Sequence, residues 1–227
     1  MHLFFLQVTD TNALAAEAGS KSLSIIELCM KGGIIMIPIT LLSIISVYIF
    51  IERYFAIRKA TKNSPDFMRN IRDYMTGGNV GAAEALCRSE NSPMSRMVDK
   101  GLKRLGKPLD TISTAIENVG NLELLQLEKG LNVLATIAGI APMLGFLGTV
   151  TGMIRAFFDI ANSENNVTPG LLASGIYEAL VTTVAGLVVG IIAFMFYNYL
   201  VNLVSKVVYK MEATSVEFID LLQEPVK

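Results

Sequence analysis

The feature that most constrains this chain is an apolar run of about thirty residues, 171–204, whose only charged side chain is Glu178. A helix of about 20 residues, rising about 1.5 Å per residue, crosses the hydrocarbon core of a membrane. A carboxylate in that core costs roughly 2.5–3.5 kcal/mol and usually marks an ion or proton path. Alternatively, the span starts near Ala179 and Glu178 lies among the lipid headgroups.

Two further apolar runs cover residues 32–51, ended by Glu52-Arg53, and residues 131–158, which follow Glu128-Lys129. No alternation of period two recurs, so a membrane β-barrel is not expected. Hydrophobic residues make up 52% of the chain and charged residues 17%, in keeping with a membrane protein. The sequence therefore predicts an all-α membrane protein with three transmembrane helices, the second and third long and extending into a cytoplasmic helical region.

The orientation follows from basic residues near the ends of the spans. One side has seven of them and the other has Lys31 and Arg155. The positive-inside rule places the seven in the cytoplasm; they are Arg53, Arg58, Lys59, Lys62, Lys129, Lys206 and Lys210. The predicted organisation is then a periplasmic segment 1–31 with an interfacial helix, spans 32–51, 131–158 and 171–204, cytoplasmic helical segment 52–130, periplasmic loop 159–170, and cytoplasmic C-terminal helix 205–227.

The cytoplasmic segment reads as short helices separated by breakers, which are Gly77-Gly78-Asn79, Asn91-Ser92-Pro93 and Gly106-Lys107-Pro108. Asp110 or Thr111 is expected to cap the last of these helices. Its apolar side chains form one stripe at near-helical spacing: Ile112, Ile116, Val119, Leu122 and Leu125.

Other classes of function find little support. A net charge of −1 argues against a nucleic-acid surface. Cys29 and Cys87 lack the spacing of a metal or redox motif, and His2 is the single histidine. No phosphate loop or catalytic set of side chains is present. We therefore expect no enzyme activity, no cofactor and no metal.

Small residues recur every three or four positions in the second and third spans, which favours close packing of helices in lipid and contacts between subunits. They include Pro142, Gly145, Gly148, Gly152, Gly186 and Gly190. The hydroxyls of Thr149, Thr182 and Thr183 either bond to carbonyls of their own helix or line a polar path that begins at Glu178. Such a path would need a second titratable group from another protein.

Three segments resemble the MotA/TolQ/ExbB proton channel family. They are LEKGLNVLATIAGIAPMLGFLGTVTGMIRAF at 127–157, GIYEALVTTVAGLVVGIIAFMFYN at 175–198, and ERYF at 52–55. Three spans with a large segment between the first two are similar to the ExbB/TolQ branch of the family. The outer N-terminal segment is more similar to ExbB.

The resemblance implies a subunit of an inner-membrane motor in a Gram-negative bacterium. Such subunits form a homopentamer whose pore holds an ExbD-like single-span partner, and proton flow energises a TonB-like protein for outer-membrane import. It places the proton pathway at Glu178, Thr149 and Thr183, although Thr182 leaves open which threonine faces the pore. The alternatives are a TolQ-like motor for envelope maintenance and a non-conducting helical scaffold.

Overall fold

The computed structural model describes residues 32–61, 66–162 and 169–224, and no strand occurs among them. The predicted segment 1–31 and its interfacial helix lie outside the described residues. The helices are α3 (Met36–Thr61), α4 (Phe67–Thr76), α5 (Val80–Glu90), α6 (Pro93–Leu102), α7 (Leu109–Glu128), α8 (Leu131–Ala161) and α9 (Pro169–Gln223).

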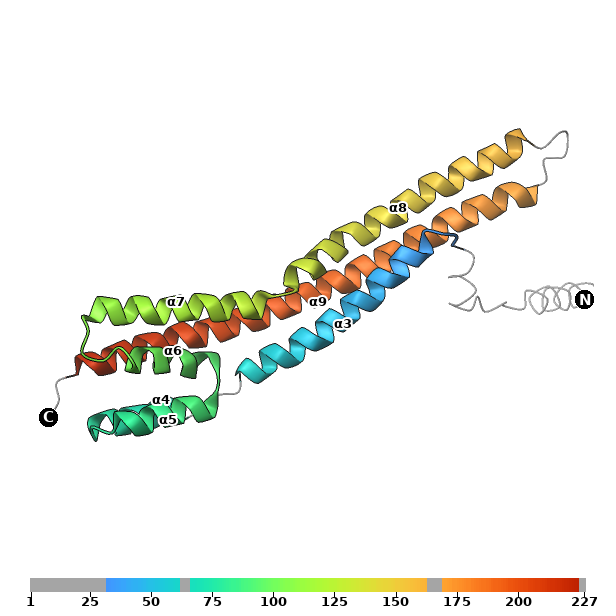
Figure 1. Ribbon diagram of the computed structural model, residues 1–227. Coiled ribbons are helices and arrows are strands. Elements are labelled where there is room, and N and C mark those ends of the chain that lie inside the picture. Colours follow the sequence, from blue (N-terminus) through green and yellow to red (C-terminus); the bar gives the residue numbers. More distant parts are fainter. Residues whose placement is uncertain (1–31, 62–65, 163–168, 225–227) are drawn as a thin grey trace, which may run out of the picture.

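The helices form an elongated bundle, drawn in Figure 1. At one end, α8 and α9 run antiparallel, and α3 lies along the middle of α9. At the other end, α7 packs on the second half of α9, and α4 to α6 cover the same region. Helix α9 is thus common to both ends of the molecule.

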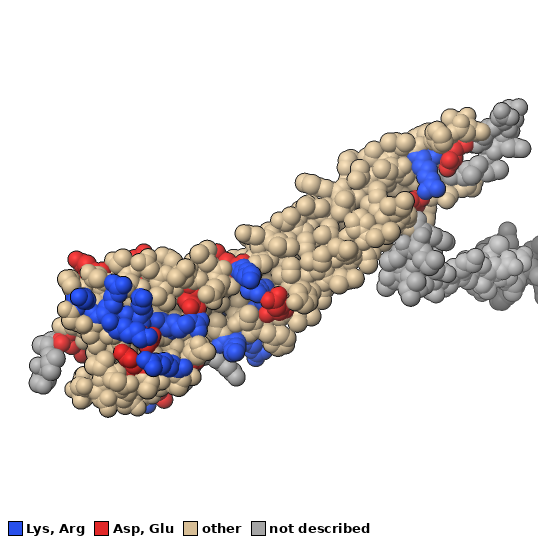
Figure 2. Space-filling view, viewed as in Figure 1, with Lys and Arg blue, Asp and Glu red and all other residues tan. Residues whose placement is uncertain are grey.

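Three helical stretches are long and apolar enough to cross a membrane: Met36–Thr61, Leu109–Ala161 and Ala173–Gln223. No charged residue occurs in 36–51 of α3, 131–154 of α8 or 179–205 of α9. Figure 2 shows the result as a broad tan surface between a densely charged end and a few charges at the opposite tip. These findings confirm the prediction of an all-α membrane protein with three spans.

Helices α3 and α9 both continue beyond the inner ends of the predicted spans. Helix α3 begins at Met36 after a turn in which Gly33 has φ +65°, and it continues to Thr61. Helix α9 runs for 55 residues, so the stretches predicted as a span to 204 and a separate C-terminal helix are one helix. It continues because no proline follows Pro169 before its end and its glycines are spread singly along it.

All three predicted breakers separate helices in the charged end. Gly78, Asn91 and Gly106 each adopt positive φ. Ser92 caps α6 in a reciprocal pair with Ser95, in which each side chain accepts from the other's backbone N–H. The breakers therefore define the helices that the sequence indicated.

The predicted cap of α7 was wrong, because the helix begins at Leu109 and its N-cap is Pro108. The Pro108 carbonyl accepts from the backbone N–H groups of Thr111 at 2.9 Å and Ile112 at 3.2 Å. Proline, whose ring fixes φ near −65°, starts the helix without help from a polar side chain. Asp110 therefore lies in the first turn rather than at the cap.

The apolar stripe of α7 does not face one side of the core. Ile112 and Ile116 are buried in the hydrophobic core cluster of the charged end, to which several helices contribute side chains. Leu122 and Leu125 are exposed. In this half of α7 the buried positions are Glu123 and Leu127. The Glu123 carboxylate accepts from Arg96 of α6 at 2.6 Å and 2.5 Å. This two-bonded ion pair fixes α6 on α7 and turns the two leucines outward.

Candidate functional site

Small residues bring α8 and α9 into close contact. A Cβ added to Gly145 would lie 3.0 Å from the Thr182 carbonyl oxygen, and one added to Gly152 would lie 3.0 Å from the Ala179 Cβ. A Cβ added to Gly186 would lie 2.5 Å from the Ala141 carbonyl oxygen. Larger side chains at these positions would therefore separate the helices.

The contacts keep one antiparallel register along the pair. Gly152 lies against Ala179 and Gly145 against Gly186, so each step forward in α8 matches a step back in α9. A Cβ added to Gly190 would lie 2.6 Å from the Pro142 Cγ and 3.1 Å from the Ala138 carbonyl oxygen, which receives no N–H from Pro142.

These small residues therefore pack within one chain. Gly148 belongs to the same seam, because it lies under the side chain of Thr182. The predicted helix packing is thus made between α8 and α9 of one chain, and contacts between subunits stay a prediction. The two helices pack in this way because their small faces are complementary and belong to consecutive helices of the same chain.

The two adjacent threonines of α9 have different surroundings. Thr182 is only 1% exposed, and its hydroxyl donates to the Ala179 carbonyl at 2.8 Å within its own helix. Thr183 is half-buried, and its hydroxyl donates across the interface to the Gly145 carbonyl of α8 at 3.0 Å. Thr182 is therefore enclosed between the helices, whereas Thr183 is partly accessible and links them.

Thr149 lies on α8 one turn beyond Gly145. Its hydroxyl donates to the Phe146 carbonyl of its own helix at 2.6 Å. The side chain borders an open apolar groove together with Met153 and Phe157. Among the described residues no hydrogen bond joins Thr149 to Thr183, so the chain alone brings the two hydroxyls near the same seam without connecting them.

Glu178 lies at a junction of three helices. Its Oε2 is 3.9 Å from Nη1 of Arg155 on α8, and its side chain is 26% exposed. Its Oε1 lies against Gly33, in the turn before α3, where a Cβ would collide with it. The carboxylate is therefore held between a cation and the start of the first span.

Arg155 is the partner of Glu178, a pairing that was not predicted from the sequence. The antiparallel register of α8 and α9 indicates this pair, because Ala156 packs on Gly175 and Arg155 then lies about one turn from Glu178. Arg155 is 70% exposed, so most of its guanidinium faces away from the seam. Gly33 could not be found from the sequence, since its contact depends on how α3 crosses α9.

Glu178 lies at the rim of the uncharged region. At the other border, the rings of Phe50 and Phe196 stack at 4.0 Å and those of Tyr54 and Tyr199 lie 6.3 Å apart. Tyr199 is 21 positions after Glu178, or about 31 Å along a helix. Because a hydrocarbon core is about 30 Å thick and tyrosines favour its borders, Glu178 lies close to the opposite border.

The fold and this site define a multi-pass helical membrane protein with the Glu178–Arg155 pair at a membrane border and hydroxyls further in. Residues 89–213, more than half of the chain, match the MotA/TolQ/ExbB proton channel family. The chain belongs to that family.

Curated relatives agree with this assignment. An ExbB-like 1 protein of Synechocystis sp. is 33% identical over 179 residues, which cover 78% of this chain and 70% of that protein. An ExbB homolog of Methanothermobacter thermautotrophicus is 31% identical over 83% of this chain and 67% of its own length. The Tol-Pal system protein TolQ of Haemophilus influenzae is 30% identical over 78% of this chain and 84% of its own.

Proposed function

We propose that this protein is the proton-channel subunit of an ExbB–ExbD-type motor, which uses the proton gradient to energise TonB-dependent import across the outer membrane. Membership of a proton channel family supports this function. One elementary charge that crosses 100 mV releases about 2.3 kcal/mol, so a few protons supply useful work.

The observation that carries the proposal is the position of Glu178 and the threonines. In the described parts of the three spans, no carboxylate lies deeper than Glu178, and the hydroxyls of Thr149, Thr182 and Thr183 follow inward. Hydroxyls orient water or a carboxyl group but do not take up a proton at neutral pH. The deeper proton acceptor therefore comes from a partner, an ExbD-like single-span protein with an acid in its helix.

The proposed arrangement places the motor in the inner membrane of a Gram-negative bacterium. The N-terminus and the Glu178 rim face the periplasm, and the charged end with α4 to α7 faces the cytoplasm, in keeping with the placement of basic residues. Protons then enter beside Glu178. The subunit forms a homo-oligomer, a pentamer by its resemblance to the family, around the partner's helix.

Two other functions have specific support. The TolQ relative, which this chain matches over 84% of that protein, supports a motor for envelope maintenance instead of import. The hydroxyls of Thr149 and Thr182 both donate to carbonyls of their own helices. They are therefore satisfied without a proton path, as in a non-conducting scaffold. Copurification distinguishes the import motor from the envelope-maintenance motor, because a TonB-like partner identifies the import motor and a TolA-like partner identifies the envelope-maintenance motor.

Proton uptake into vesicles tests conduction directly. The chain is purified with its single-span partner, placed in liposomes containing a pH-sensitive dye, and given a pH gradient. We expect uptake by the complex and strongly reduced uptake by Glu178→Gln, which keeps hydrogen bonding but removes titration. Glu212→Gln, on the exposed surface of α9 at the charged end, is the matched control. Uptake by Glu178→Gln equal to that of the unchanged complex would reject this role, and no uptake by any complex would favour the scaffold.

A further inference from the structure

Two exposed rows of side chains run along the charged end of the bundle. The α7 row consists of Thr111, Thr114, Asn118, Leu122 and Leu125, and the α9 row of Lys206, Tyr209, Ala213, Val216 and Asp220. Both repeat every three or four residues, so each forms one face of its helix. Their large apolar members, Leu122, Leu125, Tyr209 and Val216, are 60–73% exposed.

Lipid does not cover these rows. The α7 row comes before Glu128 and Lys129, which precede the second span, and the α9 row begins at Lys206, which follows the third. Tyr209 is ten positions beyond Tyr199, which is about 15 Å past the border marked by the aromatic rings. Large apolar side chains gathered on a water-exposed face indicate a protein contact.

The two rows lie at the same level along the bundle. A Cβ added to Gly120 of α7 would lie 3.9 Å from the Met211 Cε of α9, so the antiparallel register of α8 and α9 continues into this end. Within about one helical turn, Leu122 is therefore level with Tyr209, and Thr111 with Asp220. Copies of a membrane protein stand upright at the same depth, so the α7 row of one copy meets the α9 row of another at matching positions.

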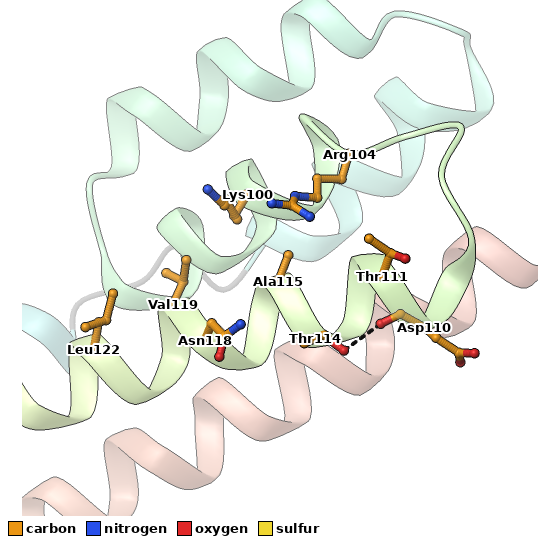
Figure 3. Close-up of a pocket in the computed structure, with 9 residues that line it drawn as sticks. All are labelled: Lys100, Arg104, Asp110, Thr111, Thr114, Ala115, Asn118, Val119 and Leu122. Carbon is orange, nitrogen blue, oxygen red and sulfur yellow. Dashed lines mark hydrogen bonds between the residues drawn. The ribbon is translucent and has the colours of Figure 1, made fainter.

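Charges decide which rows face each other. Lys100 and Arg104 project over the start of the α7 row, beside Thr111 and Asn118, as Figure 3 shows. The level α9 positions carry Asp220 and, beside it, exposed Glu217. Contact between two α7 rows would bring Lys100 and Arg104 together, and contact between two α9 rows would bring the acids together. Contact of α7 with α9 instead sets Lys100 and Arg104 against Asp220 and Glu217. Asp110, which lies beside Arg104 at the start of the α7 row, contributes one acid to that row.

We propose that the α7 row of one copy packs on the α9 row of the next copy, with Leu122 against Tyr209 near its membrane-side end and Arg104 paired with Asp220 at its cytoplasmic end. Such a head-to-tail contact uses different surfaces on the two partners, and repeating it closes a ring when the rotation permits. The inference relies on the proposed function only for the existence of a homo-oligomer, and its test measures assembly rather than proton flow.

The experiment uses two single-cysteine proteins in the full-length chain with Cys29→Ser. One carries Leu122→Cys and the other Tyr209→Cys, both at exposed positions that tolerate substitution. Cys87 is buried, and the background without an introduced cysteine is the control for it. The two proteins, with different tags, are coexpressed, and membranes are treated with a short bis-maleimide.

We expect a mixed dimer carrying both tags only when the two proteins are coexpressed, with less than a tenth as much dimer from either alone. Dimers in the Leu122→Cys protein alone would show that α7 rows face each other and would overturn the proposal. So would a product of the mass of chain plus single-span partner, or no dimer at all in membranes. Proton uptake plays no part in these outcomes.

Charge reversal tests the ion pair separately. Arg104→Glu and Asp220→Arg should each reduce the mixed-dimer yield several-fold, and the two changes combined in one chain should restore it. Both side chains are exposed in the chain, so a loss from misfolding is not expected, and circular dichroism checks it. A combined variant no better than the single ones would refute this pair.

Discussion

Thr183→Val separates a proton path from simple packing. The change keeps the shape of the side chain and removes the hydroxyl that donates to the Gly145 carbonyl at 3.0 Å. Deleting one hydrogen bond costs about 1 kcal/mol, and bonds between helices in membranes average about 0.6 kcal/mol. The packing of α8 on α9 would therefore weaken by about fivefold at most. A change of this size leaves the small-residue seam, and hence the folded chain, in place.

Proton conduction should respond far more strongly. If the Thr183 hydroxyl orients water or the partner's carboxyl group, Thr183→Val should lower proton uptake by the vesicle complex at least tenfold with normal copurification of the partner. Thr149→Val should act in the same way. Thr182→Val is the matched control, because its hydroxyl is enclosed and bonds only within α9. Normal uptake by the Thr149→Val, Thr183→Val double variant would refute the path, and loss of uptake in Thr182→Val alone would assign the pore position to Thr182.

Three further predictions concern stability, reactivity and topology. Gly186→Leu should lower the thermal unfolding temperature of the detergent-solubilised chain, because the new side chain meets the α8 backbone. Gly139→Ala, with open space around the residue, should not lower it. Equal unfolding temperatures would contradict the close packing of α8 on α9. Burial raises the pKa of the Cys87 thiol to about 12. Its maleimide labelling at pH 8 should therefore be about 1,000-fold slower than that of an ordinary thiol, and it should become fast on denaturation. Fast labelling of the folded protein would show that the thiol is accessible. In whole cells a membrane-impermeant maleimide should label Asn162→Cys at once and Ser89→Cys only after permeabilisation, both in chains that also carry Cys29→Ser. The opposite pattern would invert the proposed orientation.

The elements of the fold were readable because their signals are local. Long apolar runs specify spans, and glycine, asparagine and proline at positions such as Gly78 and Asn91 stop helices. The sequence predicted that the third span extends into a cytoplasmic helical region, but not that α9 stays unbroken to Gln223. The change from apolar to charged residues near 204 marks the end of a membrane, not the end of a helix. The helix continues where the backbone hydrogen bonds continue, whatever solvent surrounds it.

The site was less predictable because it depends on contacts between distant residues. Glu178 and the threonines were identified by their chemistry, but the enclosure of Thr182 and the link from Thr183 to Gly145 follow from the register of two helices. Leu122 and Leu125 matched the expected stripe in spacing, yet the inward positions on that part of α7 are Glu123, paired with Arg96, and Leu127. Periodicity alone cannot say that an ion pair occupies the inside.

The unbroken length of α9 has a mechanical consequence. Its 55 residues form one rod about 83 Å long, of which Glu178 lies near one end. A rod of that length that tilts by about 5° about its outer end moves its inner end by about 7 Å. A small change of tilt at the Glu178 rim is therefore enlarged along the rod into a displacement about as wide as a side chain at the charged end of the bundle.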